Sequence, residues 1–180
     1  GIVIGTRCKD VKPEDAFDQI VGYTIYNDIT AREVQRSQAL GGVFLGKNFD
    51  TTNPIGPYLV TADEIPDPHA VQIQLSVNGT LKQDFNTSDM AHKIPRCIEW
   101  VSSIHALEPG DILATGTNHR GLSSFQDGDL VELEIEAVGK LSINVADDLK
   151  RTWSRDTRLQ HADKKLDGVH TPQLTGKHAP

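Results

Sequence analysis

The chain has 180 residues and a mass of 19.7 kDa, and 37% of its residues are hydrophobic. This length predicts one domain, or one domain with an appendage, and the composition excludes a wholly disordered chain. Acidic residues outnumber basic ones by 25 to 18, and the sequence shows no basic patch of the kind that binds nucleic acid. No apolar run approaches the ~20 residues that a membrane-spanning helix needs. We therefore expect small molecules or other proteins as partners, and neither nucleic acid nor membrane.

The two cysteines, Cys8 and Cys97, are too few and too far apart for a disulfide framework or a thiolate metal cluster. This usage favours the reducing cytoplasm. The opening segment Gly1–Gly5 has the composition of a strand interior and does not resemble a signal peptide. We therefore expect the sequence to be a fragment of a longer polypeptide whose first strand is cut.

In chain order, the first part of the sequence predicts short strands and short helices. β-branched and aromatic runs predict strands, and apolar residues three or four positions apart predict helices. Thr30 and Glu33 have the spacing of a capping box, which places a helix start at Thr30. The expected elements are strands at Ile2–Ile4, Ile20–Tyr26 and Tyr58–Thr61, helical turns at Pro13–Gln19, a helix at Thr30–Ala39 ended by Gly41-Gly42, and a loop at Lys47–Pro57.

The second part predicts two hairpins and one longer helix. Alternation of apolar and polar residues predicts half-buried strands, and Asn78-Gly79 is a strong hairpin signal. The expected elements are strands at Val71–Val77 and from Leu81, an amphipathic helix at Ile94–Ile104, a strand at Ile112–Thr115 after the turn Pro109-Gly110, and strands at Leu130–Val138 and Leu141–Val145 joined at Gly139-Lys140.

These elements predict a strand-dominated α+β domain over residues 1–147 and a polar tail over residues 148–180. The tail is nearly coreless apart from Trp153, so we expect it to cover a neighbouring surface or stay mobile, with His161, His170 and His178 in solvent. The sequence lacks regular βαβ alternation and a Gly-x-Gly-x-x-Gly turn, which argues against dinucleotide binding.

The first candidate site lies between residues 22 and 35. Asp28 follows a buried strand and precedes the expected helix, where Arg32 and Gln35 share a face. Arg32 falls in the first turn, where the helix dipole disfavours a cation by up to about 1 kcal/mol. This position is consistent with an anion held by the guanidinium and the helix N-terminus. The alternative is that Asp28 assists capping and Arg32 pairs with Glu33 or Glu14.

Two further segments are candidates. Lys47 lies between Phe44 and Phe49 and is either a desolvated, reactive amine or a loop lysine that covers Phe49. In the segment 114–121, backbone N–H groups, hydroxyls and Arg120 can bind a carboxylate, unless this is an ordinary turn. None of the seven histidines forms a pair with metal-ligand spacing, and only His119 lies beside a candidate site.

Six motifs follow one another in order along the chain. They are Gly22-Tyr23-Thr24 with Asn27–Arg32 and Gln35; Gly46–Asp50; Gly56-Pro57; Val77-Asn78-Gly79; Pro109–Ile112 with Thr115-Gly116-Thr117; and Gly128–Glu132. Together they resemble the fumarylacetoacetate hydrolase family over residues 1 to about 147. The resemblance implies a mixed β-sandwich roll, and a homodimer or larger homo-oligomer.

The resemblance also implies a divalent cation, usually Mg²⁺ and sometimes Mn²⁺ or Ca²⁺, held by three carboxylates. Asp28 matches the third ligand. The first two form a Glu-x-Glu pair just before the segment that matches Gly1–Gly5, so we expect them upstream of residue 1, as we do the family's His-Glu base. Two interpretations follow: an enzyme whose sequence is incomplete here, or a piece that lacks metal and activity.

By the same resemblance, Lys47 and Arg32 are the catalytic candidates. Lys47 matches a residue that orients or deprotonates water, or that holds an enolate. Arg32 and Gln35 match residues that contact substrate oxygens, and Thr117 matches the turn that binds the carboxylate. The family often continues Thr-Gly-Thr-Pro where this chain has Asn118-His119, which leaves the choice of substrate open.

The implied function is metal-dependent hydrolysis of a C–C bond in a 2-oxo or β-diketo acid, of the acylpyruvate or fumarylacetoacetate type, in the catabolism of aromatic compounds. The alternatives within the family are a decarboxylase, isomerase, hydratase or lyase that acts on a related 2-oxo acid. The alternative from another class is a non-catalytic binding module with the same fold.

Overall fold

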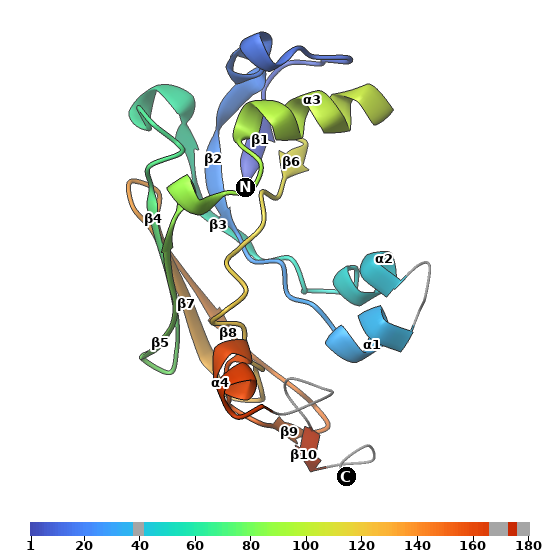
Figure 1. The fold of residues 1–180 in the computed structure, drawn as a ribbon, viewed down its shortest axis with the longest axis vertical. Helices are drawn as coiled ribbons and strands as arrows, with labels where there is room; N and C mark the ends of the chain where they lie inside the picture. Colours follow the sequence, from blue (N-terminus) through green and yellow to red (C-terminus); the bar gives the residue numbers. More distant parts are fainter. Residues whose placement is uncertain (38–41, 166–172, 176–180) are drawn as a thin grey trace. The chain divides into compact units, whose positions relative to one another are not determined.

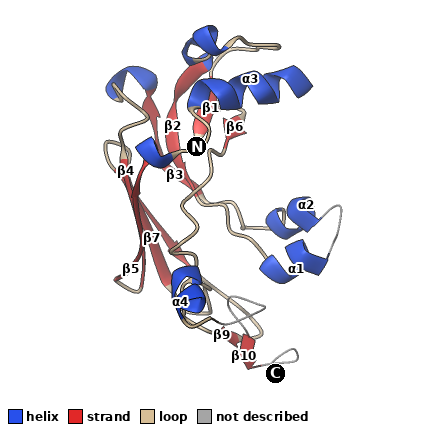
Figure 2. Cartoon of the chain, in the orientation of Figure 1, coloured by secondary structure: helices blue, strands red, loops and turns tan. Residues whose placement is uncertain are grey.

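The computed structural model describes residues 1–37, 42–165 and 173–175. These residues form two compact units. Unit 1 contains Gly1–Pro66, His92–Thr115 and Ala137–Gly139, and unit 2 contains Asp67–Ala91, Gly116–Glu136 and the described residues from Lys140 on. Figure 1 labels the elements, and Figure 2 shows strands and helices in both units. The prediction of a strand-dominated α+β fold is confirmed.

Unit 1 contains an antiparallel sheet with the strand order β3-β2-β1-β6. Ile2 of β1 pairs with Tyr23 on one side and Leu113 on the other, so β1 is central. The apolar run of β1 is typical of a strand covered on both faces, and Ile2 and Ile4 are buried accordingly. The strands are β1 (Ile2–Ile4), β2 (Ile20–Tyr26), β3 (Ile55–Thr61) and β6 (Ile112–Leu113).

The longest helix of unit 1 forms where apolar residues recur at helical intervals over the longest stretch of sequence. In α3 (Ile94–Ile104), Ile94, Ile98 and Ser102 are buried at four-residue intervals, as the amphipathic pattern predicts. The Ser102 hydroxyl accepts a hydrogen bond of 3.0 Å from the Val11 N–H, which ties this helix to the segment before the first turns. The other helical elements are single turns at Pro13–Asp15, Phe17–Gln19 and Ala62–Glu64, α1 (Arg32–Ser37) and α2 (Gly42–Lys47).

Two expectations for this region are wrong. The helix α1 begins at Arg32, and Thr30 does not cap it: the Thr30 hydroxyl lies 3.2 Å from the Asp28 carbonyl oxygen, to which it donates. Gly42 begins α2 and does not end a helix, so the expected loop starts only after Lys47. Residues 38–41, which include the expected helix end at Gly41, lie outside the described residues.

Unit 2 contains a second antiparallel sheet, in the order β5-β4-β7-β8. Asn78 and Gly79 both have positive φ values, as a tight two-residue hairpin turn requires. The second hairpin turns earlier than expected: β7 ends at Ile135, Ala137 has φ of 62°, and the predicted turn residue Gly139 begins β8. The strands are β4 (Gln72–Val77), β5 (Thr80–Asn86), β7 (Leu130–Ile135) and β8 (Gly139–Asn144), followed by β9 (Thr152–Trp153) and β10 (Gln173–Thr175).

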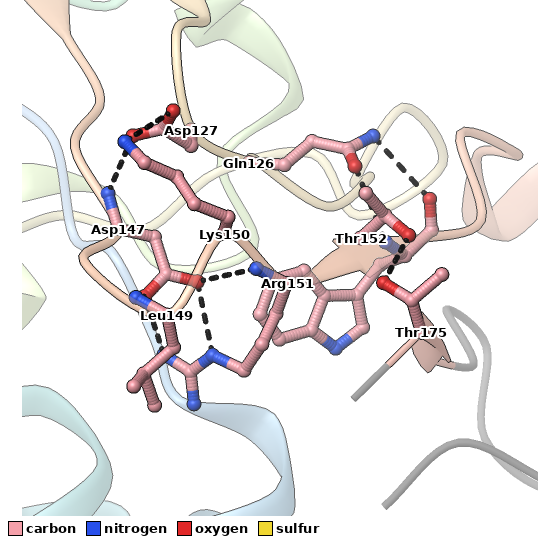
Figure 3. A network of polar contacts seen from close by, with 9 residues as sticks. Gln126, Asp127, Asp147, Leu149, Lys150, Arg151, Thr152 and Thr175 are labelled. Atoms are coloured by element: carbon pink, nitrogen blue, oxygen red, sulfur yellow. Dashed lines mark hydrogen bonds and ion pairs between the residues drawn. The ribbon is translucent and has the colours of Figure 1, made fainter. Parts of the chain in front are cut away.

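The described part of the C-terminal segment packs on unit 2 through charged groups. Asp147 accepts hydrogen bonds from the Arg151 guanidinium at 2.9 and 3.0 Å, and Lys150 donates to Asp127 at 2.8 Å (Figure 3). The Arg151 guanidinium also lies 5.3 Å from the centre of the Trp153 ring. Ion pairs and a cation–π contact thus take the place of an apolar core in the segment that we expected to cover a neighbouring surface or stay mobile.

The expectation that His161 lies in solvent is wrong. His161 belongs to α4 (Arg158–Asp163) and is only 3% exposed. The side chain of Thr157 caps this helix, and a capping box with Gln160 closes its first turn. His170 and His178 lie outside the described residues.

A buried ion pair attaches this segment to the sheet of unit 2. The carboxylate of Asp129, which is 2–3% exposed, accepts two hydrogen bonds from the Arg155 guanidinium, at 2.5 and 2.8 Å. It also accepts from the Asn78 side chain and the Gln126 N–H. Burial alone would raise the pKa of Asp129, but these hydrogen bonds together lower it. Asp129 is therefore a charged group held in place from three segments of the chain.

We expect Arg155→Leu to lower the free energy of unfolding by about 2 kcal/mol at pH 7, because the buried Asp129 carboxylate loses two charged hydrogen bonds. Since the pKa of Asp129 is lowered on folding, its contribution is complete above the unfolded value of ~3.9 and is lost as the pH falls through the folded value. The difference between wild type and variant should therefore narrow below about pH 4. Urea unfolding at several pH values measures this difference in the free energy of unfolding.

The matched control is Arg7→Leu, which removes the ion pair between Arg7 and Glu108, two largely exposed side chains 2.8 Å apart. Exposed pairs contribute ~0–1 kcal/mol, so the control should change stability little. Equal effects of the two substitutions would show that the Asp129 pair does not anchor the segment.

No helix in the described part of the chain is long and apolar enough to cross a bilayer.

Candidate active site

Asp28 lies two residues beyond the end of β2, in a loop held at fixed points. The N–H groups of Asn27 and Ile29 donate to the carbonyl oxygens of Pro54 and Thr52, at 3.0 and 3.1 Å. These bonds bind the segment after β2 to the segment before β3, on the side where the chain enters α1. The Asp28 side chain is 40% exposed, so its carboxylate is accessible to a ligand.

Lys47, the last residue of α2, reaches this carboxylate. The Lys47 ammonium forms an ion pair with Asp28 and donates a hydrogen bond of 3.0 Å to the Thr30 hydroxyl. The Lys47 side chain is 26% exposed, whereas Phe44 and Phe49 are themselves 70% and 51% exposed. The polar partners of the amine are a carboxylate and a hydroxyl oxygen.

The approach of α2 to α1 makes this contact possible. The Ala31 N–H donates to the Gly46 carbonyl oxygen at 2.8 Å. A Cβ atom on Gly46 would lie 3.1 Å from the Ala31 carbonyl oxygen and 3.2 Å from the Gln35 Cβ. Only glycine fits between the helices without displacing them, and the next residue, Lys47, is thereby placed beside Asp28.

Arg32 and Gln35 form a second polar pair on α1. The Arg32 guanidinium donates to the Gln35 side-chain oxygen at 3.0 Å, so the two side chains share one face as predicted. Because Gln35 borders Gly46, this pair belongs to the same helix pair as Lys47. Unit 1 thus brings together four of the five predicted site residues, whereas Thr117 belongs to unit 2, where its hydroxyl accepts a hydrogen bond of 2.9 Å from Gln83.

Hydrogen bonds from residues that were not predicted from the sequence fix the backbone of Lys47. The Asn53 side-chain amide and the Thr52 hydroxyl donate to the Lys47 carbonyl oxygen, at 3.0 and 3.1 Å. The Tyr26 hydroxyl in turn donates to the Asn53 side-chain oxygen at 2.6 Å. Burial, and then the nearby Asp28, raise the pKa of Tyr26, which keeps this hydroxyl a donor. Asn and Thr in an expected loop gave no signal of this role.

The donor chemistry of Asp28 suits a hard divalent cation, which prefers oxygen ligands. Its carboxylate is accessible and the Thr30 hydroxyl lies nearby. Within the described ranges, however, no three His, Cys, Asp or Glu side chains gather into a metal-binding group. The described residues therefore fit one ligand position and do not complete a cation site.

Comparison with known proteins places these features in a family. The family described as Fumarylacetoacetate (FAA) hydrolase C-terminal matches residues 1–146. The chain belongs to this family. The match confirms the resemblance drawn from the six motifs, and it ends before the segment that carries Arg155 and α4.

Relatives with this fold carry out different reactions. An uncharacterised protein of Pyrococcus abyssi is 47% identical over 80% of this chain and 64% of its own length. A mitochondrial oxaloacetate tautomerase of Xenopus laevis is 43% identical over 78% of this chain and 46% of its own length. The chain thus spans about half to two thirds of the curated relatives that it matches.

Solved structures confirm the fold. The 5-carboxymethyl-2-hydroxymuconate delta-isomerase of Mycobacterium smegmatis superposes with a TM-score of 0.75 at 41% identity, over 81% of this chain and 55% of that chain. The maleylpyruvate hydrolase of Sphingobium sp. SYK-6, determined with a manganese(II) ion and pyruvate, gives 0.73 at 38% identity, over 81% and 51%.

We expect Gly46→Val to lower the free energy of unfolding by about 1–3 kcal/mol, because the added side chain must displace the Ala31 and Gln35 backbone from α2. The matched control is Leu45→Val, which adds the same β-branched residue to α2 at a position that is 47% exposed. Thermal unfolding compares the stability of the two variants. Equal stability of the two variants would show that the helices do not need the close approach.

Proposed function

We propose that this chain forms part of an enzyme that converts a small 2-oxo acid through its enolate, with keto–enol tautomerisation or double-bond isomerisation as the reaction. The supporting observation is the position of the Lys47 ammonium between the Asp28 carboxylate and the Thr30 hydroxyl, on the same helix pair as Arg32 and Gln35. This arrangement offers a proton at a fixed nitrogen next to donors for a carboxylate.

The residues have separate tasks in this proposal. Arg32 presents a planar guanidinium, which matches the two oxygens of a carboxylate. Its hydrogen bond to Gln35 orients both side chains before substrate arrives. Lys47 holds a proton at Nζ and gives it, or a hydrogen bond, to the oxygen that becomes negative as the enolate forms. Burying this charge beside a fixed cation costs little reorganisation, which favours the enolate.

Thr117, which belongs to unit 2, stays a prediction as a substrate-binding residue. Its hydroxyl oxygen accepts from the Gln83 amide, so its proton remains available to donate to a carboxylate oxygen. Asp28 is proposed to supply one oxygen ligand to a divalent cation, Mg²⁺ or Mn²⁺. Such a cation, when bound, would polarise the keto group and stabilise the enolate.

Hydrolysis of a C–C bond, which the sequence analysis favoured, is the second candidate. The likeness to a maleylpyruvate hydrolase supports it. Tautomerisation moves one proton from carbon to oxygen: Lys47 is placed to protonate the oxygen, and a second group must take the proton from carbon. Hydrolysis requires in addition a base for water and the cleavage of a C–C bond. A homodimer and a cytoplasmic location stay predictions.

The reaction is tested with a panel of 2-oxo acids in the presence of Mg²⁺ or Mn²⁺, using the enol absorbance of oxaloacetate for tautomerisation and pyruvate release from acylpyruvates for hydrolysis. We expect metal-dependent tautomerisation that Asp28→Asn abolishes while the melting temperature changes little, because the Asp28 side chain is exposed. Full activity of Asp28→Asn would remove Asp28 as a ligand. Binding of the acids without turnover of any of them would favour the non-catalytic module.

For Lys47→Ala we expect kcat to fall by at least about 100-fold, the usual contribution of a positioned acid or base, with a much smaller change in metal affinity. Lys140→Ala is the control, because Lys140 is an exposed lysine paired with Glu134 in the other sheet. Steady-state kinetics and calorimetric titration with Mn²⁺ measure the two effects. An unchanged kcat would make Lys47 an ordinary surface lysine.

A further inference from the structure

A polar groove in unit 2 lies where three segments meet. It encloses about 220 Å³ between β5, the loop that contains Arg120, and the start of α4. All three segments belong to unit 2, so the groove can be analysed without reference to the Asp28 and Lys47 cluster. Its size suits a small organic acid.

The inner side of the groove is built tightly. Gln83 of β5 is buried, and its side-chain amide donates to the Thr117 hydroxyl and the Asn118 carbonyl oxygen, at 2.9 and 2.5 Å. A Cβ atom on Gly121 would lie 1.8 Å from the Lys82 carbonyl oxygen, so only glycine lets the loop approach β5 this closely. The loop and the strand therefore form one fixed wall.

The outer side comes from the segment beyond the family match. The N–H groups of Arg158 and Leu159 donate to the carbonyl oxygens of Leu122 and Arg120, at 2.8 and 2.9 Å. The Lys82 ammonium donates to the Arg155 carbonyl oxygen at 3.3 Å, and the Arg155 guanidinium is anchored on Asp129. Two hydrogen bonds thus fix the start of α4 against the loop, and three more fix the preceding Arg155 to Lys82 and Asp129.

The groove carries two cations, Lys82 and Arg120. Its one carboxylate, Asp84, already accepts hydrogen bonds from the side chains of Gln72 and Gln74. Asp156, whose charge also acts on Lys82, pairs with Lys164 at 2.7 Å. Within the described part of the chain, Arg120 forms no ion pair. The two acidic groups are thus already engaged, whereas Arg120 lines the cavity without an ion pair among the described residues.

We propose that this groove binds a small carboxylate anion, with Arg120 and Lys82 as the cationic ligands and the Thr157 turn as the closing wall. A guanidinium and an ammonium that line one polar cavity match the two oxygens of a carboxylate. The site requires the C-terminal segment, because without residues 155–159 the cavity has only one side. The inference does not rest on the proposed reaction at Asp28 and Lys47.

The test is a titration of the ¹⁵N-labelled chain with malonate, followed by amide chemical shifts. We expect saturable shifts confined to residues 82–84, 118–121 and 157–159. Arg120→Gln should weaken binding about tenfold, which corresponds to ~1.4 kcal/mol. Arg96→Gln is the control, because Arg96 is an exposed arginine paired with Glu99 in unit 1, and it should leave the affinity unchanged.

A second pair of variants tests whether the Thr157 turn forms part of the binding groove. Thr157→Ala removes the hydroxyl that caps α4 and should weaken binding severalfold, whereas Thr157→Ser keeps a capping hydroxyl and should restore it. Inorganic phosphate is titrated in parallel to separate a carboxylate site from a phosphate site. Shifts that never saturate, equal affinity of Arg120→Gln and wild type, or tighter binding of phosphate than of malonate would each overturn the proposal.

Discussion

The fit of α2 against α1 at Gly46 is the constraint on which the candidate active site depends. Residues 28 and 47 are far apart in sequence and lie on different elements, so no local rule brings them together. The backbone contact between Ala31 and Gly46 does so, and it leaves the Lys47 chain just long enough to reach both Asp28 and Thr30. The same contact places Gln35 next to Gly46, so one glycine lies beside both polar pairs.

Cationic side chains gather at the two candidate sites, although the net charge of the chain is −7. An anionic substrate is repelled by the whole molecule at long range, so it must be held by cations that are already in place. Unit 1 supplies Arg32 and Lys47 on adjacent helices, and unit 2 supplies Lys82 and Arg120 in the lining of a groove. In each unit a neighbouring polar group fixes at least one of these cations.

The sequence predicted the fold where local signals and packing agree. The helix Ile94–Ile104, the strand Ile20–Tyr26 and the turn at Asn78-Gly79 all have the residues and bounds that we expected. Each depends on hydrophobic periodicity or on a backbone conformation that few residues adopt. The six motifs likewise identified the family, because their order constrains the fold more than any one of them does.

The sequence could not predict features set by contacts between distant segments. Thr30 matched a capping box, but its hydroxyl binds the Asp28 carbonyl and Lys47 instead. The helix Gly42–Lys47 is too short to show a period, and we expected Gly41-Gly42 to end the preceding helix. The C-terminal segment lacks an apolar pattern, and polar groups fix it instead: His161 is buried there, and Arg155 pairs with the buried Asp129 of unit 2.

Asp129 lies inside the region that matches the family, whereas its cation, Arg155, lies beyond the end of that region. A boundary drawn where the family match ends would therefore separate a buried carboxylate from the guanidinium that neutralises it. Any protein that shares the Gly128–Glu132 motif without this segment must satisfy the carboxylate in another way. A protease cut before Arg155 would consequently do more than remove a terminus: it would leave an uncompensated charge beneath the first hairpin of the sheet.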